Sequence, residues 1–251
     1  MSDQNQRHQL TDFIAVEHTE QHLYLSFSKP HQILSSAVLN GGLQWACGVL
    51  NLKVPKQLSE FEPAEQTLSR YGADLGCEGM GCEGVDCGCE DADLNEKGVL
   101  VGMMTAASMA SYRLACRKEQ GVEIFVLATA GLSNARRAGD LAEYRRITSE
   151  PEEAGTINLM MATNACLTEA AMVESLMMIT EAKAAVLQDA GIMSPVSGLI
   201  ATGTGTDSVA VINGFGPEVR YCGKHVLFGE LLAQAVIEAV QGAVSWDRAQ
   251  L

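Results

Sequence analysis

The stretch TINLMMATNACLTEAAMVESLMMITEAKAAVLQDAG (156–191) decides the fold, because it joins an apolar strand to the longest helical pattern in the chain. Residues 156–164 form a short apolar run that predicts a buried strand. Residues 166–191 contain no helix breaker before Gly191, which predicts one long helix that ends at this glycine. A strand that leads directly into a long helix is typical of α/β and α+β proteins.

The sequence on either side extends the same pattern. The segment VEIFVLATAGL (122–132) predicts a second buried strand, and residues 227–244 predict a closing helix. Further predicted elements are β-rich runs at 12–18, 22–28 and 31–39, a short helix at 63–72, and strands at 196–203 and 208–214 joined like a hairpin through TGTD; residues 43–54 are ambiguous. We therefore expect an α/β or α+β fold, a single-domain layered sandwich over residues 1–251 with a mixed sheet packed by a few long helices.

The charge balance restricts the partners of the protein. The 251 residues include 31 acidic and 17 basic side chains, which gives a formal net charge of −14. Nucleic acid and anionic membrane surfaces bind clustered Lys and Arg, so we expect neither as a partner. The polar N-terminal segment lacks the apolar centre of a signal peptide, and the apolar runs are shorter than the roughly 20 residues of a membrane span. These features predict a cytoplasmic protein.

The long predicted helix carries two unusual polar features. At 100° per residue, Glu174, Glu181 and Gln188 form one narrow polar stripe on an otherwise apolar helix. This stripe is either the solvent-facing edge of the helix or a row that presents a carboxylate to a cleft. Lys183 points the other way, among apolar residues, so it either extends to solvent or meets an internal acid.

The segment LIATGTGTDSVAV (199–211) concentrates short polar residues before an apolar strand. Glycine lets the backbone turn its N–H groups toward an anion, and Thr and Asp add polar side chains beside them. The segment is either an ordinary glycine hairpin or a binding site, and it lacks the lysine of a phosphate-binding P-loop. The candidate binding residues here are Gly203, Thr204, Gly205, Thr206 and Asp207.

Two other loops follow or precede predicted elements where functional residues commonly lie. ATAGLSNARRAGD (128–140) places Asn134 shortly after a buried strand. YCGKHVLFGELL (221–232) places His225 just before the closing helix, a position that is as often structural as catalytic.

The stretch from about 74 to 97 is rich in Gly, Cys and acidic residues and has no hydrophobic period, which predicts a loop. Cys77, Cys82, Cys87 and Cys89 lie within it in the pattern C-x4-C-x4-C-x-C. Four thiolates are ligands for a structural Zn²⁺ or an Fe–S centre, but this spacing matches neither a pair of C-x2-C knuckles nor a ferredoxin run. The alternative is an acidic loop without metal.

Several motifs occur in an order that resembles a known family. They are LSSAVLNGG (34–42), ATAGLSNARRAGD, GTINLMMATN (155–164) with its helix ending in TEAK (180–183), ATGTGTDSVAV (201–211) and YCGKHVLFGELL. The series resembles the adenosylcobinamide amidohydrolase (CbiZ) family from about Ile33 to about Leu232. The resemblance implies a hydrolase of corrinoid (cobinamide) salvage in cobalamin biosynthesis. Such an enzyme cleaves the amide between a corrin propionate and aminopropanol, and releases adenosylcobyric acid.

This chemistry requires an activated nucleophile, a stabilised oxyanion and a proton for the departing amine. Asp207 or Glu181 is the expected base for a water molecule, and His225 the expected proton donor. A covalent nucleophile at Thr204 or Thr206 is the alternative. Asn134 and the backbone N–H groups around Gly203 and Gly205 are expected at the oxyanion, with Lys183 as a further substrate contact.

Two other functions remain open at this point. The chain could bind or sense corrinoids without hydrolysis, or it could be a metal-dependent amidase that uses the Cys-rich loop. We expect a corrinoid small molecule as substrate and no required cofactor, with a homo-oligomer left open.

Overall fold

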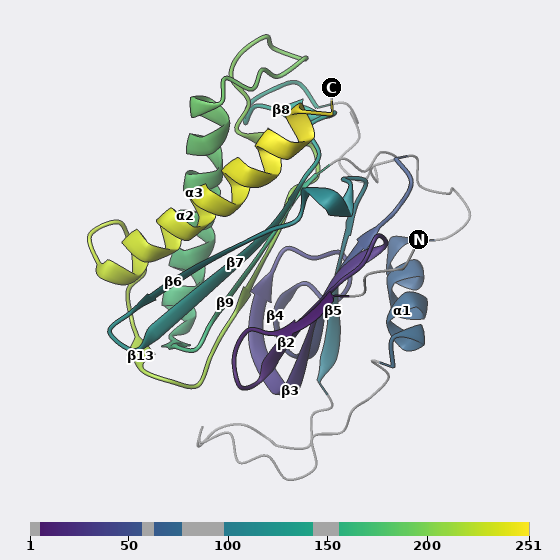
Figure 1. Ribbon diagram of the computed structural model, residues 1–251. Coiled ribbons are helices and arrows are strands. Elements are labelled where there is room, and N and C mark those ends of the chain that lie inside the picture. Colours follow the sequence, from purple (N-terminus) through teal and green to yellow (C-terminus); the bar gives the residue numbers. More distant parts are fainter. Residues whose placement is uncertain (1–5, 57–62, 77–97, 143–155, 251) are drawn as a thin grey trace.

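The computed structural model describes residues 6–56, 63–76, 98–142 and 156–250 (Figure 1). Three helices are present in these ranges, α1 (Ala64–Asp74), α2 (Glu169–Asp189) and α3 (Leu227–Arg248), with a 3₁₀ turn at Met109–Ser111. The main sheet consists of β1 (Gln6–Gln9), β2 (Ile14–His18), β3 (His22–Ser35), β4 (Gly42–Lys53), β5 (Val99–Thr105), β6 (Arg113–Glu119), β7 (Val122–Ala130), β9 (Ile157–Thr163) and β12 (Ser208–Ile212). Two short pairs lie outside it: β8 (Ala135–Arg136) with β11 (Gly203–Thr204), and β10 (Cys166–Leu167) with β13 (Glu218–Val219).

The long strand β3 joins the two halves of this sheet. The strand order is β1-β2-β3-β12-β9-β7-β6, and β4 pairs with both β3 and β5. The first half of β3 pairs with β2, whereas its last residues, Ile33–Ser35, pair with β12. A register shift between Ser26 and His31 separates the two halves of the strand. The sheet therefore folds over on itself, as the curled strands in Figure 1 show.

Side chains of the central strands are buried on both faces. In β7, Ile124 and Val126 face α2 and α3, whereas Phe125 and Leu127 pack in a second core with residues of β2–β5. A third core lies between α1 and the outer side of β4 and β5, where Leu68 contacts Leu50 and Leu100. The layers thus run helix, sheet, sheet, helix. Strands buried on both sides read as continuous apolar runs, which is the pattern in 122–132 and 156–164.

The predicted fold class is confirmed, but two features of the strands differ from the prediction. The runs predicted at 22–28 and 31–39 form the single strand β3. The three predicted helices form, and the ambiguous residues 43–54 belong to β4. The predicted hairpin is wrong: of the first run only Gly203 lies in a strand, β11 (Gly203–Thr204), which pairs with β8. The second run is β12, which lies parallel to β9. Parallel pairing joins segments distant in sequence, so the local turn residues gave no signal for it.

The structure does not test two of the expectations from the sequence, the metal site and the single domain. Cys77, Cys82, Cys87 and Cys89 lie outside the described residues, so the metal site stays a prediction, as does the extent of a single domain. Within the described ranges, one helix, α3, is long and apolar enough by composition to cross a membrane, and about half of it is buried inside the protein. The sequence contains no unbroken apolar run of this length, because Glu and Gln residues interrupt the apolar residues of α3.

His31 of β3 lies beside the C-terminal end of β12. Its side chain is buried, and its Nδ1 lies 2.6 Å from the backbone oxygen of Asn213. The imidazole packs against Phe27 and Phe215 with ring centroids 4.8 and 4.7 Å away. Burial lowers the pKa of His31 to about 4; the bond to Asn213 opposes this shift and the charge of Lys29 adds to it.

This shift predicts a loss of stability in mild acid. Between pH 6.5 and about 4, the unfolded chain binds a proton at residue 31 that the folded chain does not bind, so the free energy of unfolding falls as the pH falls. The contribution is on the order of 3 kcal/mol across that window. Denaturant unfolding of the wild type and His31→Phe at pH 7 and pH 4.5 measures it. The variant should lose less stability than the wild type, and equal losses would contradict the assignment.

Candidate active site

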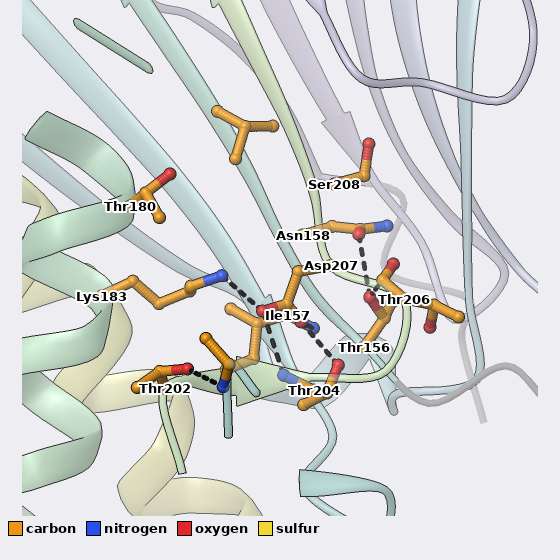
Figure 2. Close-up of polar contacts among 12 residues, drawn as sticks. Thr156, Ile157, Asn158, Thr180, Lys183, Thr202, Thr204, Thr206, Asp207 and Ser208 are labelled. Atoms are coloured by element: carbon orange, nitrogen blue, oxygen red, sulfur yellow. Dashed lines mark hydrogen bonds and ion pairs between the residues drawn. The ribbon is translucent and has the colours of Figure 1, made fainter. Parts of the chain in front are cut away.

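Two parallel strands begin side by side beneath helix α2. Ser208 of β12 lies opposite Asn158 of β9, so the residues that precede each strand, Asp207 and Thr156, meet at the same edge of the sheet. Side chains alternate along each strand, and Asp207 therefore faces the helical layer together with Val209. Lys183 reaches toward it from α2 (Figure 2). The register of the sheet thus delivers an acid to the buried side of a helix.

The Asp207 carboxylate accepts four hydrogen bonds. Oδ1 accepts from the Thr204 hydroxyl at 2.5 Å and from the Ile157 backbone N–H at 2.9 Å. Oδ2 accepts from the Thr204 backbone N–H at 3.1 Å and forms an ion pair with the Lys183 ammonium. The side chains of Lys183 and Asp207 are only 7% and 12% exposed. Because a carboxylate offers about four lone-pair positions, this group is fully engaged and its orientation is fixed.

Glycine is required at position 203 by the same contact. A Cβ atom there would lie 2.4 Å from Asp207 Oδ2 and 3.2 Å from Lys183 Nζ. Position 205 is also constrained, because a Cβ atom would lie 3.2 Å from Asn134 Nδ2. The glycines of the TGTGTD segment therefore leave room for the ion pair and for the Asn134 amide.

A cavity of about 560 Å³ opens onto this cluster. It is lined by Asn134, Arg136, Arg137, Ala138, Asp140, Leu141, Ala142, Thr180, Lys183, Thr202, Gly203, Thr204, Gly205, Thr206 and Asp207. All of the predicted substrate-binding residues line it, together with Asp207 from the predicted catalytic set. The Oδ1 atom of Asn134 is buried there without a hydrogen-bond partner among the described residues.

Two predicted catalytic residues do not line this cavity. Glu181 is exposed on α2 and forms an ion pair with Lys224. His225 is also exposed, in the segment before α3. Both therefore belong to the outer surface of the molecule. For Glu181 the reason is the helix geometry: successive residues are rotated by 100°, so Glu181 points away from Lys183. The acidic stripe is thus the solvent edge of the helix, and Glu174 accepts a bond from the Cys222 backbone N–H at 2.6 Å.

Two of the backbone groups expected at an oxyanion are already occupied. The Thr204 N–H donates to Asp207, and the Gly205 N–H donates to the backbone oxygen of Asn134 at 3.2 Å. The Asn134 carboxamide, which lines the cavity, is a further donor of that predicted set.

The loop 134–140 is part of the site, although the sequence analysis assigned a binding role only to Asn134 within it. The Ala138 N–H donates to Thr202 Oγ1 at 2.9 Å, and the Arg137 guanidinium donates to the backbone oxygen of Ile200 at 2.9 Å. Hydrogen bonds from Ser194, and from Ser197, hold the pKa of Asp140 below its ordinary value. These contacts fix the cavity wall that faces α2. Clustered polar residues after a buried strand were the available signal for this loop.

Among the described residues, no cysteine lines this cavity. Burial raises the pKa of Cys222 to about 11 and also raises that of Cys116, so both thiols are protonated at neutral pH. In the described ranges, no three His, Cys, Asp or Glu side chains are grouped to hold a metal ion.

The sequence places this site in a known family. The model of the adenosylcobinamide amidohydrolase (CbiZ) family matches residues 6–250. The chain belongs to this family. As an amidohydrolase it acts on amide bonds, which fits a site built from a hydroxyl, a carboxylate and an ammonium group.

One named relative agrees with this assignment. The adenosylcobinamide amidohydrolase of Methanosarcina mazei is 26% identical over 219 residues, 83% of this chain and 88% of that protein. A protein of Methanocaldococcus jannaschii is 38% identical over 171 residues, 60% of this chain and 66% of that protein. Among solved structures, a Burkholderia β-aminopeptidase shares 10% identity at a TM-score of 0.42, over 98% of this chain and 82% of that one. The family assignment rests on the sequence matches.

The buried ion pair predicts a large difference between two lysines of the amidohydrolase. Lys183→Met leaves the Asp207 carboxylate buried without its counter-charge and should lower the free energy of unfolding by about 3 kcal/mol. Lys224→Met breaks the exposed pair with Glu181 and should cost less than about 1 kcal/mol. Urea denaturation of both variants measures the two losses. Equal losses in the free energy of unfolding would show that the buried Asp207 carboxylate does not need Lys183 as its counter-charge.

Proposed function

We propose that the protein hydrolyses the amide bond between the corrin-ring propionate and aminopropanol of adenosylcobinamide. The products are adenosylcobyric acid, which re-enters cobalamin biosynthesis, and aminopropanol. One observation carries the proposal: in a chain that matches this family from residue 6 to 250, the Thr204 hydroxyl donates to a buried carboxylate at 2.5 Å beside a cavity.

Thr204 is the nucleophile in this proposal, and Asp207 is its base. A nucleophilic hydroxyl needs a base within hydrogen-bond reach, and that base needs a third group to orient it. Asp207 meets the first requirement for Thr204, and Lys183 meets the second for Asp207. The contact favours the covalent route over direct attack by water, because the base already bonds to the hydroxyl.

Lys183 is the proton donor to the departing amine, in place of His225. Its ammonium group lines the cavity, whereas His225 does not. Thr204 Oγ1 attacks the amide carbon while its proton passes to Asp207, and Lys183 protonates the amine nitrogen and is reprotonated from Asp207. Aminopropanol then leaves, and water hydrolyses the Thr204 ester to the free carboxylate. The Asn134 amide lies beside the turn, where it is placed to bond the carbonyl oxygen.

The protein needs no bound cofactor for this sequence of steps, since the hydroxyl, base and acid all come from its own side chains. We place the enzyme in the cytoplasm, an environment that keeps thiols such as those of Cys116, Cys166 and Cys222 reduced. The corrinoid is its small-molecule partner.

A product assay tests the proposal. Purified protein is incubated with adenosylcobinamide, once with added Zn²⁺ and once after treatment with a chelator, and the corrinoids are identified by mass spectrometry. We expect adenosylcobyric acid in both arms. Binding of the corrinoid without product in either arm would favour a sensing module, and product only with metal would favour a metal-dependent amidase.

Variants of the turn separate the two chemical routes. Thr204→Val removes the proposed nucleophile, and Asp207→Asn removes the base; each should lower kcat at least about 10²-fold. Thr204→Ser keeps a hydroxyl and should retain most of the activity. Steady-state kinetics with adenosylcobinamide measure the three rates. A Thr204→Val enzyme with wild-type kcat would return the mechanism to water activated by Asp207.

The rim of the cavity offers apolar surface for a large ligand such as a corrin ring. Leu141 lines the cavity and is 73% exposed. Met177 is 58% exposed on α2 and lies on the same helix face as Thr180, which also lines the cavity. Exposed apolar side chains grouped beside a pocket are typical of a binding surface.

A charge on this rim should weaken substrate binding. We expect Met177→Glu to raise KM for adenosylcobinamide about 10-fold while kcat stays within about twofold, because the loss falls on binding and not on the reacting groups. Ile237→Glu, on the exposed side of α3, is the control and should change neither constant. An unchanged KM for Met177→Glu would place the corrin ring elsewhere.

A further inference from the structure

A second polar cluster lies directly behind the candidate site, between the two halves of the sheet. Asn51 of β4, Thr129 of β7 and Asn158 of β9 are almost completely buried, with exposures of 1%, 0% and 2%. Their neighbours in this layer are apolar residues such as Leu127, Met160 and Met103. Buried polar groups are costly unless each is hydrogen-bonded, so a cluster at this point requires an explanation.

Hydrogen bonds tie this cluster together across the two sheet layers. The Asn158 amide donates to Asn51 Oδ1 at 2.7 Å and to the backbone oxygen of Met104 at 2.9 Å. The Asn51 amide donates in turn to Thr129 Oγ1 at 2.9 Å. The start of β9 is thereby fastened to β4, β5 and β7. This is the strand end against which the Gly203–Asp207 turn rests.

Thr156 connects the fastened strand to the turn. Thr156 is 1% exposed, and its hydroxyl donates to the backbone oxygen of Thr206 at 2.6 Å. Asn158 Oδ1 lies 3.4 Å from Thr156 Oγ1 (Figure 2). The next residue, Ile157, donates its N–H to Asp207. Thr156, which precedes β9, and Ile157, its first residue, thus hold two consecutive residues of the turn: Thr206 by its backbone oxygen and Asp207 by its carboxylate.

We propose that Thr156 is a positioning residue of the active site. Held by the Asn158–Asn51 bonds, its hydroxyl fixes the Thr206 carbonyl and so aligns the Asp207 carboxylate with the Thr204 hydroxyl. This role rests on the proposed function for its effect on catalysis. Its effect on the geometry of the turn is independent of any substrate.

The same strand supplies a matched control at its other end. Thr163 is fully buried, and its hydroxyl donates to the backbone oxygen of Glu123 at 2.7 Å. Thr156→Val and Thr163→Val therefore each remove one buried hydroxyl bond to a carbonyl and keep the side-chain shape; Thr163→Val also removes the bond that the hydroxyl accepts from the Ala165 N–H at 3.1 Å. A merely structural hydroxyl should affect stability similarly at the two positions, whereas only Thr156 touches the turn.

Amide hydrogen exchange tests the geometric part without substrate. We expect the Thr204 and Ile157 amides, which both bond to Asp207, to exchange about 10-fold faster in Thr156→Val and at the wild-type rate in Thr163→Val. Thr156→Ser should restore slow exchange. Unchanged exchange of both amides in Thr156→Val would overturn the inference, whether or not the protein hydrolyses adenosylcobinamide.

Kinetics test the catalytic part. In an active wild type, Thr156→Val should lower kcat about 10-fold with KM within about twofold, and Thr163→Val should leave both constants unchanged. Recovery of kcat in Thr156→Ser supports the role of the hydroxyl. Equal kcat for the two valine variants would overturn the positioning role, and an inactive wild type would overturn the proposed function while the exchange result still decides the geometry.

Discussion

The contact between Lys183 and Asp207 is the interaction on which the site depends. A carboxylate and an ammonium group buried together are stable only when each is compensated, and the Asp207 carboxylate is compensated by Lys183, by the Thr204 hydroxyl and by two backbone N–H groups. The pair joins helix α2 to the turn before β12. It also explains the glycine at 203, whose missing side chain leaves room for both charged groups.

The folded-over sheet makes this contact possible. Parallel β9 and β12 start at one edge, α2 covers one face of that edge, and the Asn51–Asn158 bonds fasten the other face to the second half of the sheet. The acid is therefore held from the helical side by Lys183 and from the strand side by the residues that begin β9. Rigid elements on both faces keep the Thr204 hydroxyl and the carboxylate in hydrogen-bond contact, which is what nucleophilic catalysis requires.

Local sequence patterns predicted the helices and most of the site. Periodicity identified α2 and α3, and the concentration of Gly, Thr and Asp identified residues 203–207 before any geometry was known. Lys183 was conspicuous because a lysine on an apolar helix face needs a partner, and Asp207 is that partner. Long-range pairing was not predictable in this way: the parallel register of β9 and β12 depends on segments about fifty residues apart, and Thr156 carries no motif of its own. Glu181 and His225 have side chains of the required chemical type, but the structure places both on the outer surface, which their sequence context did not indicate.

A crystal structure of the Asp207→Asn variant with adenosylcobinamide tests the central claim most directly. The account predicts that the corrin propionate enters the cavity between α2 and the loop 134–140, with the amide carbon about 3–3.5 Å from Thr204 Oγ1 and the amine nitrogen toward Lys183. A corrinoid bound with its scissile amide away from Thr204, for example in the groove of Arg117, Gln234 and Glu238 beside α3, would contradict it.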